Sequence, residues 1–395
     1  MRFIDVIVVG SGPGGAMTAI TLAKRGYSVL VFEKHSLPRH KPCGGAVSAK
    51  AGELLGFPLG ALSKSRIYRA RLGVISGPWA DIDYGENHFA DIVERKEFDH
   101  HLVRIAGANG AVIHEREEFK HLVDCGDNVI VETNRGKYKG RFIVGADGAL
   151  STVRKHLGLR WKPAWGFALE GTYLFARKTK GFDPESLIID LSRQEKGYSW
   201  IFPRGDTLSA GIGTLRPKLP GARTKLEKYM RQKGLGSSEP ELLCGHPVPV
   251  DGAAKKVLHG KAGVLVGDAA GLVDPLTGEG IYYALLSGKI AGEELSMALY
   301  SGRRDLHNYS VRINREISKK LKSAAITAAF LYRQPEFAVK LIGADPSLGR
   351  LLLEVICGGE SYNTFLCRCA VTMLAKRPFQ WKAEYRDSKS LPTEK

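Results

Sequence analysis

The 395-residue sequence lacks any uninterrupted apolar run long enough to cross a membrane. A spanning helix needs about 18 such residues or more, so no transmembrane helix is expected. A glycine-rich motif already starts at Gly10, which leaves no room before it for a secretory or transit peptide. The sequence therefore predicts a cytoplasmic protein, unless the chain binds to the surface of a membrane.

Cysteine is scarce, and its spacing is not that of a metal site. The six cysteines are Cys43, Cys125, Cys244, Cys357, Cys367 and Cys369, and no two of them form a C-x-x-C pair. Zinc ribbons and cluster sites depend on such pairs. No metal site is therefore predicted, and reduced thiols without a special role are expected everywhere except at Cys43.

Acidic residues are too few to balance the basic ones, and the formal net charge is +17. Residues 301–395 carry 17 Lys and Arg against 9 Asp and Glu, mixed with stretches rich in Leu, Phe and Ala. Such a segment can lie on anionic lipid, so a membrane surface is a candidate partner, and a solvated basic face is the alternative. No nucleic-acid-binding motif accompanies the charge, so no nucleic acid is expected as a partner.

A nucleotide-binding motif is present near the start of the chain. The apolar residues 4–9 run into Gly10, Gly12, Gly14 and Gly15, which contain the spacing G-x-G-x-x-G. Such glycines let the chain turn tightly, let backbone amides approach a pyrophosphate and let helix and strand pack closely. The N-terminus of the following helix supplies a positive pole for the phosphates.

An acidic residue completes this motif. Glu33 ends the next apolar segment, residues 29–32, where a carboxylate can accept hydrogen bonds from a ribose. Strand, turn, helix and acid together favour an adenine dinucleotide site for FAD or NAD(P). A tight turn that serves packing alone is the alternative.

Three separated blocks are predicted to form one FAD-binding domain of the Rossmann type. The blocks are residues 1–64, 92–164 and 251–300. Within them, residues 95–99 open a helix, residues 141–148 and 262–268 are typical of buried strands that end in turns, and a helix follows from Ile281.

The remaining residues predict two further units. Residues 65–91 and 165–250 have β-branched and aromatic content with hairpin-like turns, which predicts an inserted antiparallel β-sheet domain for the substrate. Residues 301–395 are predicted to be a helical C-terminal region, with helices over 308–332 and 337–356. The expected fold class is therefore α/β.

Later motifs favour flavin over nicotinamide. Asp268 follows Gly267 at a strand end and is expected near the sugar or ribityl part of a dinucleotide. Residues 275–281 start a helix whose amides can face the isoalloxazine ring, and that N-terminus stabilises negative charge on reduced flavin. No further G-x-G-x-x-G motif indicates a separate nicotinamide domain.

The sequence resembles the FAD-dependent superfamily of aromatic hydroxylases, flavin halogenases and geranylgeranyl reductases. The matching segments are residues 10–15, residues 145–148 with Ser151 and Arg154, and residues 267–268. The segments Lys41–Gly45 (KPCGG), Tyr198–Pro203 (YSWIFP) and Pro275–Ile281 (PLTGEGI) resemble the geranylgeranyl reductase family specifically. Members of that family saturate prenyl double bonds in archaeal ether lipids, the chlorophyll side chain or related isoprenoids, using reduced FAD.

Some positions depart from these patterns. Glu195 stands where the family usually has a proline, three residues before Tyr198. Gly271 stands where hydroxylases usually carry a histidine, which argues against that branch. Tyr198 replaces the first tryptophan of the halogenase motif W-x-W-x-I-P, which argues against halogenation.

The resemblance implies a catalytic face. Tyr198, Trp200 and Phe202 alternate along a predicted strand and share one face, which is expected to line a channel for a polyprenyl chain; ordinary core is the alternative. Cys43 is expected to contact flavin or substrate, and a buried structural thiol is the alternative. Saturating an alkene needs a hydride and a proton, and Cys43, Tyr198 and an ordered water are the candidate proton sources. The predicted catalytic residues are Cys43, Tyr198 and Trp200.

The resemblance also implies the cofactor contacts. Arg95, in the context R-x-x-F-D-x-x-L, is expected at the FAD pyrophosphate or ribose, because arginine suits phosphate. Phe119 is expected on the strand that meets the adenine, with strand packing as the alternative. The residues predicted to contact FAD are Gly10, Gly12, Gly14, Gly15, Glu33, Lys34, Cys43, Gly44, Ala46, Arg95, Phe119, Asp147, Asp268, Gly278, Gly280 and Ile281.

The expected function is reduction of the double bonds of a geranylgeranyl chain on a lipid, diphosphate or chlorophyll-type substrate. A monooxygenase or halogenase of the same fold is one alternative, and a non-catalytic flavin electron carrier is another. Ferredoxin, NAD(P)H and a quinol all stay open as the electron donor.

Overall fold

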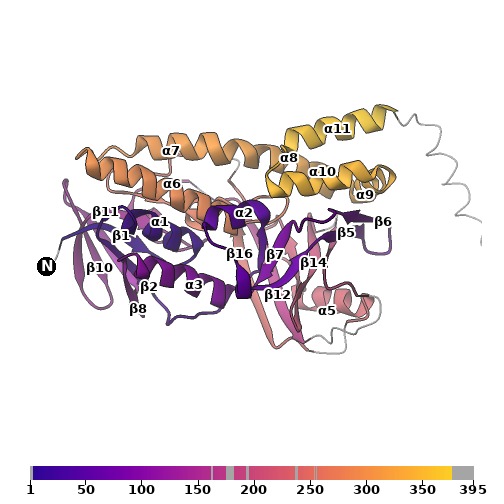
Figure 1. The fold of residues 1–395 in the computed structure, drawn as a ribbon, viewed down its shortest axis with the longest axis horizontal. Helices are drawn as coiled ribbons and strands as arrows, with labels where there is room; N and C mark the ends of the chain where they lie inside the picture. The colour runs from indigo at the N-terminus through magenta and orange to yellow at the C-terminus, as the bar shows by residue number, and fades with distance from the viewer. Residues whose placement is uncertain are drawn as a thin grey trace, which may run out of the picture.

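The computed structural model describes residues 3–161, 163–174, 182–192, 195–235, 239–252, 254 and 256–375. Two large sheets lie side by side, and a layer of helices from the second half of the chain covers both (Figure 1). The predicted α/β fold class, with a Rossmann-type unit, an inserted sheet and a helical C-terminal region, is confirmed.

The first sheet contains the glycine-rich motif. Its strand order is β8-β2-β1-β11-β10-β9, with β17 beside β11. The strands that pair in parallel are β1 (Phe3–Val9), β2 (Val29–Glu33), β8 (Val112–Glu115), β11 (Lys137–Gly145) and β17 (Gly263–Leu265). Strand β10 (Val129–Thr133) pairs antiparallel with both β11 and β9 (Phe119–Asp124). Helices cover the parallel strands, so successive residues such as 6–9 are all buried, as is typical of a parallel sheet.

Two helices that cover this sheet pack closely against each other at glycine residues. α1 (Pro13–Ala23) packs against α6 (Ile281–Tyr300), and α3 (Arg95–Ala108) packs on the other side of α1. A Cβ atom on Gly288 would lie 2.3 Å from the Gly14 carbonyl oxygen. One on Gly292 would lie 2.5 Å from the Thr21 side chain. The contacts advance together along both helices, so α1 and α6 run parallel and their N-termini lie at the same edge.

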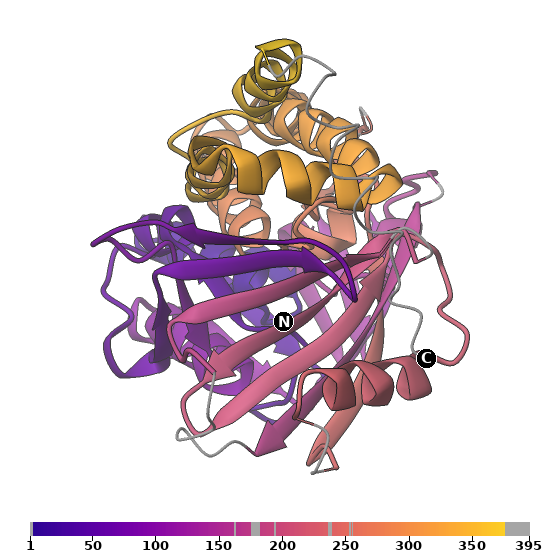
Figure 2. The ribbon, with the colours of Figure 1, turned by 90° about the vertical axis from the view of Figure 1, so that its right-hand side faces the viewer.

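The second sheet has the order β16-β12-β15-β14-β13-β5-β6. Its strands are β5 (Arg69–Val74), β6 (Trp79–Asp83), β12 (Trp165–Leu174), β13 (Ser186–Ser192), β14 (Gly197–Arg204), β15 (Thr207–Thr214) and β16 (Leu242–Pro249). The prediction of a purely antiparallel sheet is wrong at one place, because β13 pairs with β5 in parallel. Figure 2 shows α5 (Ala222–Gln232) on one side of this sheet and the C-terminal helices on the other.

A small third sheet connects the two larger ones. It consists of β3 (Ala46–Ser48), β7 (Ala90–Val93) and β4 (Ser63–Ile67), with α2 (Ala49–Leu55) following β3. A 3₁₀ turn over residues 60–62 precedes β4, while the short helix α4 (Val153–His156) and the 3₁₀ turn 267–270 follow β11 and β17 of the first sheet. The segment 65–91 is therefore shared, since only β5 and β6 join the large sheet while its two ends belong to the small one.

The described part of the predicted C-terminal region, residues 301–375, is helical with one additional break, and residues 376–395 of that prediction lie outside the described residues. It contains α7 (His307–Ile313), a π-helical turn (Asn314–Ser318), α8 (Lys319–Arg333), α9 (Pro335–Ala344), α10 (Pro346–Cys357) and α11 (Tyr362–Ala375). The single helix expected over 337–356 is wrong, because Pro346 forces Asp345 into an extended conformation and Asp345 then caps α10. Among the described residues, no helix combines the length and apolarity needed to cross a bilayer.

We expect Gly288→Ala to destabilise the protein by about 1–3 kcal/mol, because the new methyl group would meet backbone that cannot move aside. Gly52→Ala in α2 is the matched control, since a Cβ there has no neighbour within 4 Å. Alanine favours helix over glycine, so Gly52→Ala should leave stability unchanged or raise it by up to about 1 kcal/mol. Thermal unfolding measures both; equal stability of the two variants would contradict the close contact of α1 and α6.

Candidate active site

The glycine motif leaves open space at only one of its four glycines. Gly10 has a φ of +100°, and a Cβ on it would lie 2.3 Å from the Ala146 carbonyl oxygen. A Cβ on Gly15 would lie 2.0 Å from the Gly10 carbonyl oxygen, and one on Gly14 would press on α6. A Cβ on Gly12 would meet nothing closer than the Arg39 guanidinium, at 3.8 Å. Protein packing therefore explains three glycines, while Gly12 leaves a cradle that fits a pyrophosphate.

The N-termini of the parallel helices α1 and α6, with their positive partial charges, lie at the same edge of the first sheet as Gly12. The N-caps of α1 and α6 are Gly12 and Gly280, and neither helix has a capping side chain or an acidic residue in its first turn. No capping side chain therefore accepts a hydrogen bond from the first backbone amides of either helix. Helix N-termini of this kind bind anionic groups.

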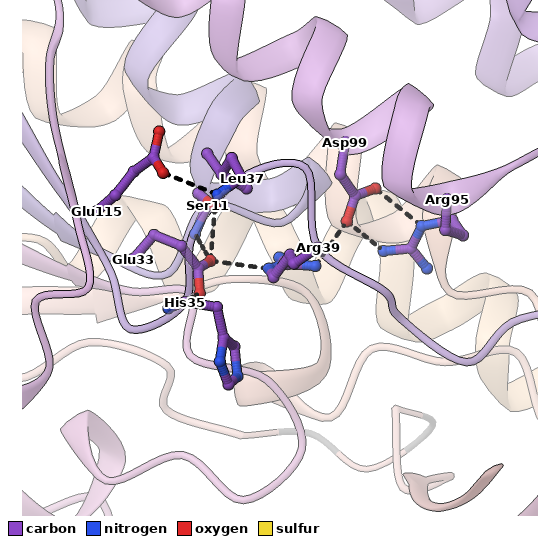
Figure 3. Close-up of polar contacts among 8 residues, drawn as sticks. All are labelled: Ser11, Glu33, His35, Leu37, Arg39, Arg95, Asp99 and Glu115. Carbon is purple, nitrogen blue, oxygen red and sulfur yellow. Dashed lines mark hydrogen bonds and ion pairs between the residues drawn. The ribbon is translucent and has the colours of Figure 1, made fainter.

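Glu33 is the acidic residue of the motif, and it lies at the end of β2 in a dense polar network (Figure 3). Its carboxylate accepts hydrogen bonds from the Ser11 hydroxyl at 2.6 Å and from Arg39 Nε at 3.0 Å. Burial alone would raise the pKa of Glu33, but Arg39, Ser11 and the His35 amide outweigh it and lower the pKa. The carboxylate is thus ionised and suited to accept ribose hydroxyl groups.

A buried carboxylate in α3 holds two arginines beside this network (Figure 3). Asp99 is fully buried and accepts two hydrogen bonds from Arg95, at 2.8 and 2.9 Å, and one from Arg39 at 3.2 Å. Burial would lower the pKa of Arg95, but Asp99 and the neighbouring Cys43 thiol raise it, so Arg95 stays charged. The role of Arg95 toward FAD stays a prediction.

Arg39 was not predicted from the sequence, although it is the side chain nearest the Gly12 cradle. It bridges Glu33 and Asp99, which fixes its guanidinium over the glycine turn. The sequence did contain a signal for Arg39, because it lies between Glu33 and the 41–45 segment, and an arginine at such a position can bind a diphosphate. Arg39 is therefore a further candidate for holding the pyrophosphate.

Other predicted cofactor residues lie around the same edge. Asp147 caps α4 by accepting from the amides of Thr152 and Val153 at 2.7 and 3.1 Å. Its Oδ1 atom is buried and has no hydrogen-bond partner within the described part of the chain. Asp268 lies in the turn after β17, and its Oδ1 is 3.4 Å from the position of a Cβ on Gly280. An orphaned oxygen and a carboxylate at the start of α6 both fit a polar cofactor here.

Two predicted residues lie farther out. Lys34 is exposed just after β2. Phe119 is buried at the start of β9, where its ring packs edge-on against His156 at 5.2 Å. Chain packing accounts for Phe119 without a ligand, and its contact with adenine stays a prediction.

The three segments shared with geranylgeranyl reductases meet in space. Tyr198, Trp200 and Phe202 form a continuous aromatic stripe on one face of β14, with ring centroids 5.9 and 6.2 Å apart. A Cβ on Gly44 would lie 2.8 Å from the Phe202 ring and 3.5 Å from Trp200 Nε1. The Tyr198 hydroxyl donates to the Thr277 carbonyl oxygen at 2.5 Å. The stripe thus contacts both the 41–45 turn and the 275–281 loop.

Polar groups of the second sheet fix the turn that contains Cys43. The buried Glu170 on β12 accepts from the Cys43 amide at 2.9 Å, and its other oxygen accepts from Ser209 at 3.0 Å. Lys41 Nζ lies 2.9 Å from His246 Nε2 on β16. Burial lowers the pKa of both, that of His246 to about 4, so the neutral imidazole accepts from the ammonium group. Neither Glu170 nor His246 was predicted from the sequence.

Comparison with known proteins agrees with this geometry. The chain matches the family described as FAD binding domain over residues 4–206. It is 34% identical to a geranylgeranyl diphosphate reductase of Rhodobacter capsulatus, over 76% of each chain. It is 32% identical to a menaquinone reductase of Mycobacterium tuberculosis, over 74% of this chain and 76% of the relative.

An archaeal enzyme and a crystal structure extend the comparison. The chain is 30% identical to digeranylgeranylglycerophospholipid reductase 2 of Methanothermobacter thermautotrophicus, over 80% of this chain and 85% of the relative. Its fold matches a geranylgeranyl bacteriochlorophyll reductase-like protein of Thermoplasma acidophilum with a TM-score of 0.77 at 22% identity, covering 98% and 99% of the two chains. The Gly12 cradle, Glu33 and the two helix N-termini fit FAD, which is the cofactor. The chain belongs to the geranylgeranyl reductase family of FAD-binding flavoproteins.

Proposed function

We propose that this protein saturates double bonds of a polyprenyl chain, of the geranylgeranyl type, with electrons from reduced FAD. The observation that carries the proposal is the aromatic stripe of Tyr198, Trp200 and Phe202 against the Cys43–Gly45 turn. An apolar wall beside this turn suits a long hydrocarbon, because apolar contact is what a prenyl chain offers.

The polyprenyl chain of the substrate is better supported than its head group. Geranylgeranyl diphosphate, digeranylgeranylglycerophospholipid and menaquinone, for which the three relatives are named, share a polyprenyl chain and differ in the group attached to it. We therefore assign the chain as the recognised part, on a lipid, diphosphate or chlorophyll-type molecule.

If the substrate is a lipid in a bilayer, the protein must reach it from the membrane surface. α11 exposes 56% of Val371 and 82% of Leu374, and Arg368 lies exposed on the same helix. Apolar and basic side chains together suit an anionic lipid surface. We propose that this end of the molecule faces the bilayer when the substrate is a lipid.

The chemistry divides between cofactor and protein. When bound, reduced FAD supplies the hydride for one alkene carbon. The protein must orient the double bond, exclude water and supply a proton to the other carbon. Burial, with Asp274 and Cys43 adding to it, raises the pKa of Tyr198 above its ordinary value, and its hydroxyl is already bonded to Thr277. We therefore propose that Tyr198 supports the aromatic stripe. We assign the supply of the proton for the second alkene carbon to the Cys43 thiol.

Anaerobic incubation of dithionite-reduced protein with geranylgeranyl substrates tests the function. We expect mass gains of two hydrogens per double bond, both for the soluble diphosphate and for a geranylgeranylated lipid in anionic vesicles. The lipid reaction alone should slow at high salt or in neutral vesicles, because added ions screen the attraction to the surface. Product that forms only with oxygen would indicate a monooxygenase, and flavin that cycles without any product would indicate an electron carrier.

Trp200→Ala should lower kcat/KM for a C20 prenyl substrate by about tenfold to a hundredfold, because removing the buried indole, which lies between the rings of Tyr198 and Phe202, would break the apolar wall. FAD content should stay unchanged. Trp79→Ala is the matched control, since Trp79 lies on edge strand β6 of the same sheet, against Gly73 and Lys233. Steady-state kinetics measure the difference; equal losses in both variants would place Trp200 in ordinary core.

Cys43→Ser should lower turnover by about 10²-fold or more, because a hydroxyl is a much weaker acid than a thiol. The Glu170 contact is with the backbone amide and should survive the change. Cys244→Ser, at a half-buried cysteine on β16, is the control and should keep wild-type turnover. Wild-type turnover of Cys43→Ser, with FAD retained, would show that the proton comes from another group.

A further inference from the structure

A buried carboxylate outside the predicted site organises the loop that precedes α6. Asp274 is fully buried. Its Oδ1 atom accepts from the backbone amides of Leu276 at 2.8 Å and Thr277 at 3.2 Å. Its Oδ2 atom accepts from the hydroxyls of Tyr362 at 2.9 Å and Tyr283 at 3.4 Å. One side chain thus ties the start of the loop to α6 and α11.

Two further tyrosines hold carbonyl groups of the same loop. The Tyr332 hydroxyl of α8 donates to the Leu276 carbonyl oxygen, and the Tyr198 hydroxyl donates to Thr277, each at 2.5 Å. A Cβ on Gly278 would lie 3.0 Å from the Tyr198 hydroxyl, so the loop cannot shift toward the aromatic stripe. The loop is therefore fixed from the second sheet and from the C-terminal helices α8 and α11.

The donors in this cluster keep their protons. Burial, with Asp274 adding to it, raises the pKa of Tyr283, Tyr332 and Tyr362 well above the ordinary value. A tyrosine that stays protonated can donate to a carboxylate or a carbonyl at any physiological pH. The arrangement is thus a permanent hydrogen-bond network around a buried charge, which is costly unless it is fully satisfied.

The loop held by this hydrogen-bond network lies directly before the N-terminus of α6. Residues 275–279 lead directly into Gly280, the N-cap of α6, and the first amides of this helix, which have no capping side chain, lie at the edge of the predicted FAD site. Any displacement of Leu276 or Thr277 moves these amides with it. Loss of a hydrogen bond at Tyr362 is therefore expected to reach the cofactor, although Tyr362 lies 88 residues from Asp274 along the chain.

We propose that Tyr362 and Asp274 are positioning residues for FAD, so that the C-terminal helices α8 and α11 complete the cofactor site by fixing the 275–280 loop. The inference concerns cofactor binding alone, and its outcome is independent of whether a prenyl chain is the substrate.

The test compares two buried Tyr–Asp pairs. Tyr362→Phe removes the hydroxyl bonded to Asp274. Tyr229→Phe is the matched control, because the buried Tyr229 hydroxyl donates to the buried Asp190 at 2.8 Å on the face of the second sheet covered by α5. Each change removes one hydrogen bond to a carboxylate, so both variants should lose similar stability in thermal unfolding.

Hydrogen exchange of the apoprotein and titration with FAD distinguish a role in positioning the 275–280 loop from a role in the stability of the fold alone. We expect Tyr362→Phe to raise exchange over residues 274–280 and to weaken FAD binding by about tenfold, the effect of losing one hydrogen bond to a charged group. Tyr229→Phe should change neither. Wild-type exchange and affinity in Tyr362→Phe, or equal changes in both variants, would overturn the proposal. Tyr332→Phe is interpreted in the same way if Tyr362→Phe does not fold.

Discussion

The structure depends on the close parallel contact of α1 and α6. Gly14 and Gly288 let the two backbones touch, and the Thr18 hydroxyl donates to the carbonyl oxygens of both residues. Because the helices are parallel, both positive N-terminal poles lie at one edge of the first sheet. One extended anionic cofactor can then be held by two helices that are more than 250 residues apart in the sequence. A larger side chain at the crossing would separate the two poles.

The second sheet is joined to this edge by polar contacts from buried groups. Glu170 reaches from the second sheet to the Cys43 amide, and Tyr198 reaches from the same sheet to the 275–280 loop. Both contacts cross between units whose sheets share no strand. They fix the aromatic stripe relative to the 41–45 turn and the 275–280 loop. The buried carboxylates therefore give the aromatic stripe a defined position, and the proposed substrate class rests on the apolar character of that stripe.

Local features could be predicted from the sequence, and long-range pairs could not. The strand, glycine turn, helix and Glu33 follow from residues within one short segment, as does the shared face of the aromatic stripe. The bond between Arg39 and Asp99 joins residues 60 apart, and the one between Lys41 and His246 joins residues 205 apart. Alternation of side chains also carries no information on strand direction, which is why the parallel β5–β13 pair was missed. Pro346 was a local signal, and it was overlooked.

The central claim is that reduced flavin in this protein passes its electrons directly to a prenyl double bond. Anaerobic stopped-flow mixing of the fully reduced holoprotein with geranylgeranyl diphosphate tests it most directly. The account predicts that the absorbance of oxidised flavin appears without oxygen, at a rate that depends on substrate concentration, with one double bond saturated per flavin oxidised. Flavin that stays reduced until oxygen is admitted would contradict it.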